Sequence, residues 1–459
     1  MRVQLLERKL ERANVERQLF IQQYQADLTR RKDGSGWARN ASTYRVASHY
    51  LEGLLTSGPR KSMRNLAKRV NLDRDQVERF IRESPWEPDA VQDHLRRAIP
   101  KSIRSPTAVI VIDDFGIAKQ GTHSVGVQRQ YSGTLGKTGN CQVAVNLTYC
   151  APGDERNQDQ RTWPLGTQLY LPKAWVEDPE LQSLRDEVRL PEGTMFRTKH
   201  ELAHDLLKKC WAAGVEAAAV ISDAEYGDAT LRSHLRARKQ PYALGVRHNE
   251  HFVAADAPTE TSQRNKERYP EDVNAFTIKE AAKATTRWTT IAWGEGTKGP
   301  LKGRFARLRV RGIIQPGKIR HVTDETAWLL LEQRSNELKA YVCWGLDDKT
   351  LEELVAIAHQ RWTIEQYHKE AKQLLGLDRF EGRTWRGWHK HVALVLLAYA
   401  FLATLRADAP DTAPRPPLRQ VAKALLIEAT SQEFLRTHRL EKEQARSLAA
   451  AGVRYLTDL

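Results

Sequence analysis

The chain has 459 residues and carries 72 Lys and Arg against 57 Asp and Glu, for a formal net charge of +15. This length allows two or three domains with a large core, and a basic excess spread along the chain favours a long polyanion such as nucleic acid as the partner. Four cysteines without a CxxC pair argue against a disulfide framework or a zinc ribbon, and no apolar run approaches the roughly 20 residues that a membrane span needs.

Residues 61–84 are typical of a helix-turn-helix. A first helix over 61–70 would lead into a turn at Asn71, a residue type that tolerates the left-handed backbone conformation. Asp73-Arg74-Asp75-Gln76 resembles a capping box and predicts the start of the second helix. That helix would present three arginines to DNA, namely Arg74, Arg79 and Arg82. The alternative is an ordinary pair of packed helices in a basic bundle.

From residue 108 the pattern changes to strands alternating with helices. Val109–Ile112 is continuously apolar, as expected for a strand buried on both faces, and Asp113 and Asp114 follow it. Adjacent strand residues face opposite sides, so only one of the two aspartates can point into a common site.

A second strand with an acidic end follows a helix. Thr198-Lys199-His200-Glu201 is a capping box, which predicts a helix that runs to about residue 213 and stops at Gly214. The apolar run 217–222 then predicts a strand that ends at Asp223, and this order implies a mostly parallel or mixed sheet with helices on its faces. His200 to His204 also match HExxH, but no third zinc ligand is in place, so a zinc site is not expected.

The long stretch 251–345 is predicted to be rich in strands. Ala306–Arg311 alternates strictly between apolar residues and arginines, which places Arg307, Arg309 and Arg311 on one strand face. Residues 327–331 and 338–344 are typical of further strands. We interpret the whole stretch as a β-rich insertion.

A late helix carries the third candidate carboxylate. Thr350-Leu351-Glu352-Glu353 is a capping box, so a helix is expected from Leu351 and carries Glu365 if it continues unbroken. At about 100° per residue, Arg361, Glu365 and Lys372 share one stripe, as a metal ligand beside a phosphate requires. The alternative is ordinary pairing on a helix surface. Carboxylates after two buried strands and on a late helix are how a ribonuclease H-like fold gathers oxygen ligands for magnesium.

The motif Arg-x3-Glu-x6-Lys, formed by Arg361, Glu365 and Lys372, resembles the signature of a branch of bacterial insertion-sequence DDE transposases. Further stretches are similar to one subgroup, the "DDE superfamily endonuclease" family. They are Ser84–Trp86, His123–Val127, Asn140–Val143, Leu169–Pro172 and Trp385–His389. The resemblance covers about residues 45–400. Two departures stand out: Ala358 replaces the tyrosine of this branch, and Phe115 replaces the usual threonine after the two aspartates.

The resemblance implies an α/β fold with a ribonuclease H-like catalytic core interrupted by the β-rich insertion, an α-helical N-terminal DNA-binding region and C-terminal helices. The expected domains follow in chain order. They are a helical N-terminal region (1–100), the first part of the core (101–250), the insertion (251–345), the last part of the core (346–405) and a C-terminal helical tail (406–459).

The resemblance also implies which residues carry the chemistry. Asp114, Asp223 and Glu365 would be the catalytic, metal-binding triad for Mg²⁺, with Mn²⁺ as a substitute, and the family pattern favours Asp114 over Asp113. Arg361 and Lys372 would hold the DNA phosphate. Glu225 and Asp228 would either support Asp223 or cap the helix from Ala229. Trp288 and Trp293 would either hold a flipped base or pack in a small β core.

The expected function is therefore a transposase that cuts double-stranded DNA at the element ends and joins the 3′-OH to target DNA by two-metal-ion catalysis. The implied partners are the element ends and target DNA, bound by a homodimer, with no membrane. The implied location is the bacterial cytoplasm, with nucleoid association when the protein is bound to DNA. The alternative is a catalytically silent, domesticated transposase that acts as a DNA-binding regulator.

Overall fold

The chain divides into two compact units. In the computed structural model, unit 1 contains residues 1–105, 114–216 and 365–459, and unit 2 contains residues 106–113 and 217–364. The described residues are 13–29, 41–56, 58, 61–133, 136–153, 160–257, 275–296, 299–314, 321–334, 337–408, 415–438 and 441–457. Residues 1–12 of the predicted N-terminal region therefore lie outside the description.

The chain passes between the units inside two regular elements. Strand β1 (Val109–Ala118) changes unit between Asp113 and Asp114, and helix α14 (Trp362–Leu375) changes unit between Ile364 and Glu365. Both elements carry candidate site residues at or next to the crossing. The strand also continues to Ala118, four residues beyond Asp114, so the two aspartates lie within β1 rather than at its end.

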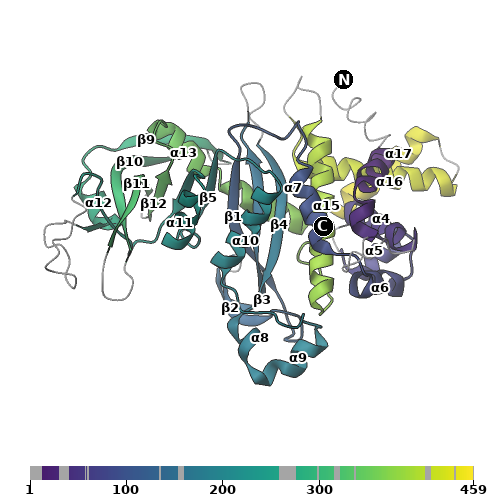
Figure 1. The fold of residues 1–459 in the computed structure, drawn as a ribbon. Helices are drawn as coiled ribbons and strands as arrows, with labels where there is room; N and C mark the ends of the chain where they lie inside the picture. Colours follow the sequence, from purple (N-terminus) through teal and green to yellow (C-terminus); the bar gives the residue numbers. More distant parts are fainter. Residues whose placement is uncertain are drawn as a thin grey trace. The chain divides into compact units, whose positions relative to one another are not determined.

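Unit 1 is mostly helical (Figure 1). Its helices are α2 (Ala13–Gln23), α3 (Gln25–Thr29), α4 (Ala41–Thr56), α5 (Met63–Arg69), α6 (Arg74–Glu83), α7 (Pro88–Arg97), α8 (Lys173–Glu177), η2 (Pro179–Leu181), α9 (Gln182–Glu187), α10 (Lys199–Ala212), α15 (Trp385–Ala407), α16 (Leu418–His438) and α17 (Lys442–Thr457). Its strands are β2 (Gln128–Ser132), β3 (Lys137–Ala151) and β4 (Arg161–Tyr170), and β3 pairs antiparallel with both of the others.

Helix α15 is the core of unit 1. It packs against β4, α4, α6, α7 and α16, and all its residues from Gly387 to Ala403 are buried. It is also long and apolar enough to cross a membrane, which the sequence analysis did not anticipate. Within the protein 83% of its most apolar 18-residue window is buried, as in the core helix of a large helical domain.

Unit 2 contains three parallel strands, and the strand order continues from them into a long antiparallel sheet. Strands β1, β5 (Ala219–Ser222) and β6 (Tyr242–Gly245) run parallel. The order then continues through β12 (Glu337–Trp344), β11 (His321–Arg334), β10 (Gly299–Ile314), β7 (His251–Ala254) and β8 (Phe276–Thr277), while β9 (Thr289–Gly296) pairs with β10. Helices α11 (Ala229–Ala237), α12 (Ile278–Ala284) and α13 (Leu351–His359) complete the unit.

Local signals in the sequence account for several element boundaries. The capping boxes at Thr198 and Thr350 start α10 and α13, and Gly214 follows α10 with φ of 75°. Asn71 adopts φ of 52° between α5 and α6, which confirms the predicted left-handed turn. Asp228 caps α11 by accepting hydrogen bonds from the backbone of Thr230 and Leu231.

The N-terminal part of α15 contains a histidine that is held neutral by its surroundings. The Nδ1 atom of His391 lies 2.8 Å from the Tyr50 hydroxyl, and its Nε2 atom lies 3.0 Å from the Gly376 carbonyl oxygen. The neutral ring can accept from the tyrosine and donate to the carbonyl, whereas the imidazolium can only donate. Burial lowers the pKa of His391 from 6.5 to about 4.

We predict that His391 makes the protein less stable in mild acid. Because its folded-state pKa is depressed, the unfolded chain takes up a proton below about pH 6.5 that the folded chain refuses down to about pH 4. The free energy of unfolding should therefore fall by roughly 2 kcal/mol from this group between pH 6.5 and 5. His391→Gln keeps an N–H donor and should lose less stability over that window in urea titrations. Equal pH slopes in the two proteins would contradict the assignment.

Candidate functional site

The register of β1 with β5 decides which aspartates share a face. Ile112 pairs with Ser222 in this parallel pair, so the next residues, Asp113 and Asp223, leave the paired region at the same level. Level residues of parallel neighbours point to the same face, and the following residue on each strand points to the other. Asp113, rather than Asp114, therefore lies on the same face as Asp223.

Asp223 lines a cavity of about 330 Å³ in unit 2. The cavity is bordered by the β5–α11 loop, the end of β6 and the first half of β12, and its charged and polar side chains are those of Asp223, Glu225, His248, Glu337, Lys339, Tyr341 and Arg361. One oxygen of Asp223, Oδ1, accepts a hydrogen bond of 2.9 Å from the Glu225 amide. Asp223 and Arg361, two of the candidate site residues, thus line the same cavity.

Arg361 lies at a break between two helices. The sequence analysis placed Glu365 on the helix from Leu351 if that helix continued unbroken. The helix is interrupted: α13 ends at His359, and Glu365 lies on α14, which begins at Trp362. The Gln360 carbonyl accepts from both the backbone N–H and the hydroxyl of Thr363, at 3.0 and 2.7 Å, which starts a new helix. The Arg361 guanidinium consequently reaches β1, where it pairs with Asp113 at 3.1 Å.

Asp114 has a different partner, within unit 1. Its carboxylate lies 2.9 Å from the ammonium nitrogen of Lys199, the first residue of α10. The sequence analysis did not single out Lys199, although its place directly after the Thr198 cap was visible. The HExxH glutamate, Glu201, accepts from the Thr198 backbone and hydroxyl and so closes the capping box.

Glu365 and Lys372 both lie on the part of α14 that belongs to unit 1. Glu365 is exposed. The Lys372 ammonium donates to the Gly116 carbonyl at 3.0 Å and lies 5.5 Å from the centre of the Phe115 ring. Burial lowers the pKa of Lys372, and nearby Asp378 opposes that shift. Lys372 is therefore attached to the strand that carries both aspartates.

The donor chemistry of these residues suits a hard divalent cation, because carboxylate oxygens are the ligands that magnesium prefers. Among the described residues, however, no three His, Cys, Asp or Glu side chains are gathered so that they could hold a metal ion. Asp113 and Asp223 belong to unit 2, whereas Asp114 and Glu365 belong to unit 1.

An aromatic cluster lies on the face of the antiparallel sheet that α13 covers. The Trp293 ring stacks on the His359 ring, with 4.1 Å between the ring centres and an angle of 12° between the ring planes. The Arg334 guanidinium lies 4.5 Å from the centre of the Trp293 ring. His359 and Arg334 both contact the buried carboxylate of Glu332. Burial raises the pKa of Glu332, but the contacts with His359 and Arg334 lower it by more, so the pKa lies below its ordinary value. Trp293 is half-buried in this cluster.

The strand face with alternating arginines is largely occupied by internal contacts. The guanidiniums of Arg307 and Arg309 lie 4.3 and 5.0 Å from the centre of the Trp328 ring. Arg307 also donates to the Lys349 carbonyl at 2.5 Å, and Arg309 pairs with Asp347. Arg311 is buried and donates to the Ala257 carbonyl. The expected three-arginine surface is thus reduced to Arg307 and Arg309.

Helices α5 and α6 form the predicted two-helix unit. Val77, Phe80 and Ile81 on α6 are buried. On the opposite side, the side chains of Arg74 and Arg82 are 62% and 51% exposed, although each also pairs with a glutamate. The exposed face of α6 therefore presents arginines together with carboxylates, among them Asp75 and Glu83.

Comparison with known proteins identifies the family. Residues 38–300, more than half of the chain, match the model of the family described as "DDE superfamily endonuclease". The chain belongs to this family. The match includes Asp113, Asp114 and Asp223 but ends before Glu365, so the assignment of Glu365 rests on the Arg-x3-Glu-x6-Lys motif.

One curated relative is described as a probable transposase for insertion sequence element IS701 from Microchaete diplosiphon. It is 30% identical over 213 residues, which cover 45% of this chain and 50% of the relative. This DDE family chain thus spans about half the length of that relative. A solved structure, the cryo-EM structure of the piggyBac transposase synaptic complex with hairpin DNA, matches 94% of this chain and 81% of its own, at 12% identity and a TM-score of 0.40. That likeness is too low to support a shared fold.

Proposed function

We propose that this chain is the transposase of an insertion sequence, which cuts DNA at the element ends and joins the freed 3′-OH to target DNA. Family membership and the similarity to a probable transposase support this function. The observation that carries it is made in unit 2: Asp223 and Arg361 line one cavity, and Arg361 pairs with Asp113, level with Asp223. Carboxylates beside a guanidinium suit a cation and a phosphate together.

Divalent metal ions, with Mg²⁺ as the first choice and Mn²⁺ as a substitute, would be held by Asp223, Glu365 and one aspartate of β1. When bound, such ions activate the attacking oxygen and stabilise the leaving oxygen of a phosphodiester. The side chains themselves hold and orient: the guanidinium of Arg361 and the ammonium of Lys372 would contact the DNA phosphate. None needs to act as a covalent nucleophile.

The β1 aspartate that acts with Asp223 is, in our proposal, Asp113. The family pattern favours Asp114, but the register supports Asp113 because it shares a face with Asp223 and contacts Arg361. Asp114 would then have a supporting role through its ion pair with Lys199.

The rest of the chain would bind DNA. The net charge of +15 and the exposed arginines of α6 support a duplex partner, with α6 in the major groove and element ends distinguished from random sequence. We propose a homodimer on DNA, so that each protomer acts at one element end, and a cytoplasmic location where the chromosome is accessible.

We predict that Glu365→Gln abolishes end cleavage while it leaves binding to end-containing DNA nearly unchanged. Loss of a supporting residue of a metal site already costs about 10- to 100-fold, so loss of a ligand should cost at least about 100-fold. Glu352→Gln, which changes an exposed carboxylate on α13, is the matched control. Magnesium-dependent nicking of labelled end DNA is the assay.

Full activity of Glu365→Gln would remove this residue from the site, and cleavage without divalent metal would reject the mechanism. A wild-type protein that binds ends but never cuts them would instead be a DNA-binding regulator.

We predict that Asp113→Asn is inactive and that Asp114→Asn retains measurable cleavage. The reason is strand alternation, which lets only one of the two carboxylates share a face with Asp223. Both variants are compared in the same nicking assay, with DNA binding as the control for folding. The reverse pattern would restore Asp114 as the ligand.

We predict that DNA binding weakens by orders of magnitude between about 50 and 200 mM salt, because each neutralised phosphate releases counterions. Arg74→Ala and Arg79→Ala should reduce the preference for element ends over random DNA if α6 enters the major groove. Arg45→Ala, an exposed arginine on α4, is the matched control. Binding titrations at several salt concentrations measure both effects. An unchanged end preference would place sequence reading elsewhere in the chain.

A further inference from the structure

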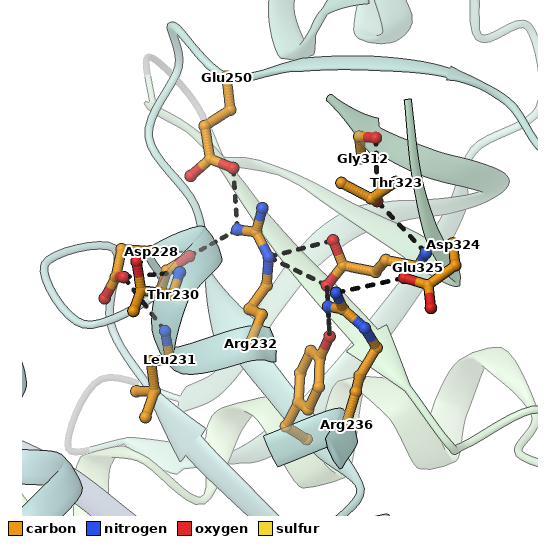
Figure 2. A network of polar contacts seen from close by, with 12 residues as sticks. Asp228, Thr230, Leu231, Arg232, Arg236, Glu250, Gly312, Thr323, Asp324 and Glu325 are labelled. Carbon is orange, nitrogen blue, oxygen red and sulfur yellow. Dashed lines mark hydrogen bonds and ion pairs between the residues drawn. The ribbon is translucent and has the colours of Figure 1, made fainter. Parts of the chain in front are cut away.

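A buried network of charges connects the loop after Asp223 to the long β10–β11 hairpin of unit 2. Figure 2 shows Arg232 of α11 between Glu250 and Glu325, with Arg236 on the other side of Glu325. The Arg232 side chain is 1% exposed and that of Glu325 is 2% exposed. Charges this deeply buried are tolerated only when they are paired and hydrogen-bonded, so the geometry of the network is strongly constrained.

Each donor of the network has a defined acceptor. Arg232 lies 3.0 Å from the Glu325 carboxylate through Nε and 2.8 Å from Glu250 through NH1. Arg236 also lies 3.0 Å from Glu325, and the Tyr242 hydroxyl donates to the same carboxylate. Two guanidiniums thus balance two carboxylates, and removal of Arg232 or Glu325 would leave an uncompensated charge in a buried place.

Arg232 also holds the loop that carries Asp223. Its NH1 group donates to the Gly227 carbonyl at 2.5 Å, four residues after Asp223. This loop is pressed against the end of β6: a Cβ atom on Gly227 would lie 1.6 Å from the Gly245 oxygen, and a Cβ on Gly245 would lie 2.7 Å from the Asp223 carbonyl carbon. Arg232 therefore holds the Gly227 end of the loop, and close backbone packing against Gly245 holds the Asp223 end.

The other anchor of the network belongs to the inserted hairpin. Glu325 is on β11, and a Cβ on Gly312 of β10 would lie 2.6 Å from its Oε2 atom. The Thr323 hydroxyl donates to the Gly312 carbonyl at 3.0 Å and accepts from the Glu325 amide at 3.3 Å. The hairpin thus presents its carboxylate to Arg232 in a fixed orientation.

We infer that Arg232, Glu325 and Glu250 are positioning residues for Asp223, and that the β10–β11 hairpin is through them a structural part of the active site. The inference rests on the proposed function, because it gives Asp223 a role in the reaction. Contacts that orient metal-binding groups without touching the metal typically change metal affinity or activity about 10- to 100-fold.

The test compares Arg232→Lys with wild type. Lysine keeps the charge but cannot reach the Glu325 carboxylate, the Glu250 carboxylate and the Gly227 carbonyl together. We expect amide hydrogen exchange in a peptide covering 222–231 to accelerate at least about 10-fold, because the loop loses its anchor. The Mn²⁺ concentration for half-maximal cleavage should rise about 10- to 100-fold, and DNA binding without metal should stay unchanged.

Two further variants keep the test decisive. Glu250→Gln removes the half-buried partner of Arg232 and should change exchange and Mn²⁺ dependence in the same direction but less, which covers the case that Arg232→Lys does not fold. Asp324→Asn is the matched control, because Asp324 is 94% exposed, adjoins Glu325 and pairs with Arg236 at 3.6 Å. It should leave both readouts unchanged.

The possible outcomes separate this inference from the proposed function. Arg232→Lys and Glu250→Gln proteins that melt earlier but keep wild-type loop exchange and Mn²⁺ dependence would overturn the inference, and the network would then serve stability alone. Full cleavage by Asp223→Asn would overturn the proposed role of Asp223, whatever the exchange data show. Faster loop exchange with raised Mn²⁺ dependence, together with an inactive Asp223→Asn, supports both.

Discussion

The parallel register between β1 and β5 is the constraint on which the proposed site depends. Ile112 opposite Ser222 sets Asp113 level with Asp223, and this alignment places these two carboxylates on one face of the sheet. A shift of one residue would turn Asp113 away and bring Asp114 onto the face of Asp223. Both strands are fully buried before their aspartates, so the apolar packing that stabilises the sheet also fixes the register of the two aspartates.

Two kinds of contact hold the groups around Asp113 and Asp223. Arg361 lies in the break between α13 and α14 and pairs there with Asp113, and the Thr363 hydroxyl donates to the Gln360 carbonyl at the same break. Behind Asp223, close glycine packing and the Arg232 network hold the following loop. Each carboxylate therefore has a cationic or backbone contact that orients it. The proposed metal site would use carboxylates whose orientation is held in this way.

The crossings between the two units bear on the same residues. The chain changes unit between Asp113 and Asp114 and again directly before Glu365.

The sequence by itself determined the features that depend on neighbours in the chain. Apolar runs predicted β1 and β5, capping boxes set the starts of α10 and α13, and Asn71 marked the turn before α6, because backbone conformation and caps are local. Family resemblance added the motif around Glu365. The tertiary structure alone decided which aspartate of β1 lies on the same sheet face as Asp223. It also decided where the helix before Glu365 breaks and that Lys199 pairs with Asp114. It also brought Arg232 to Glu325, 93 residues away. These outcomes depend on strand register and on buried charges finding partners across the fold, and no local pattern encodes either.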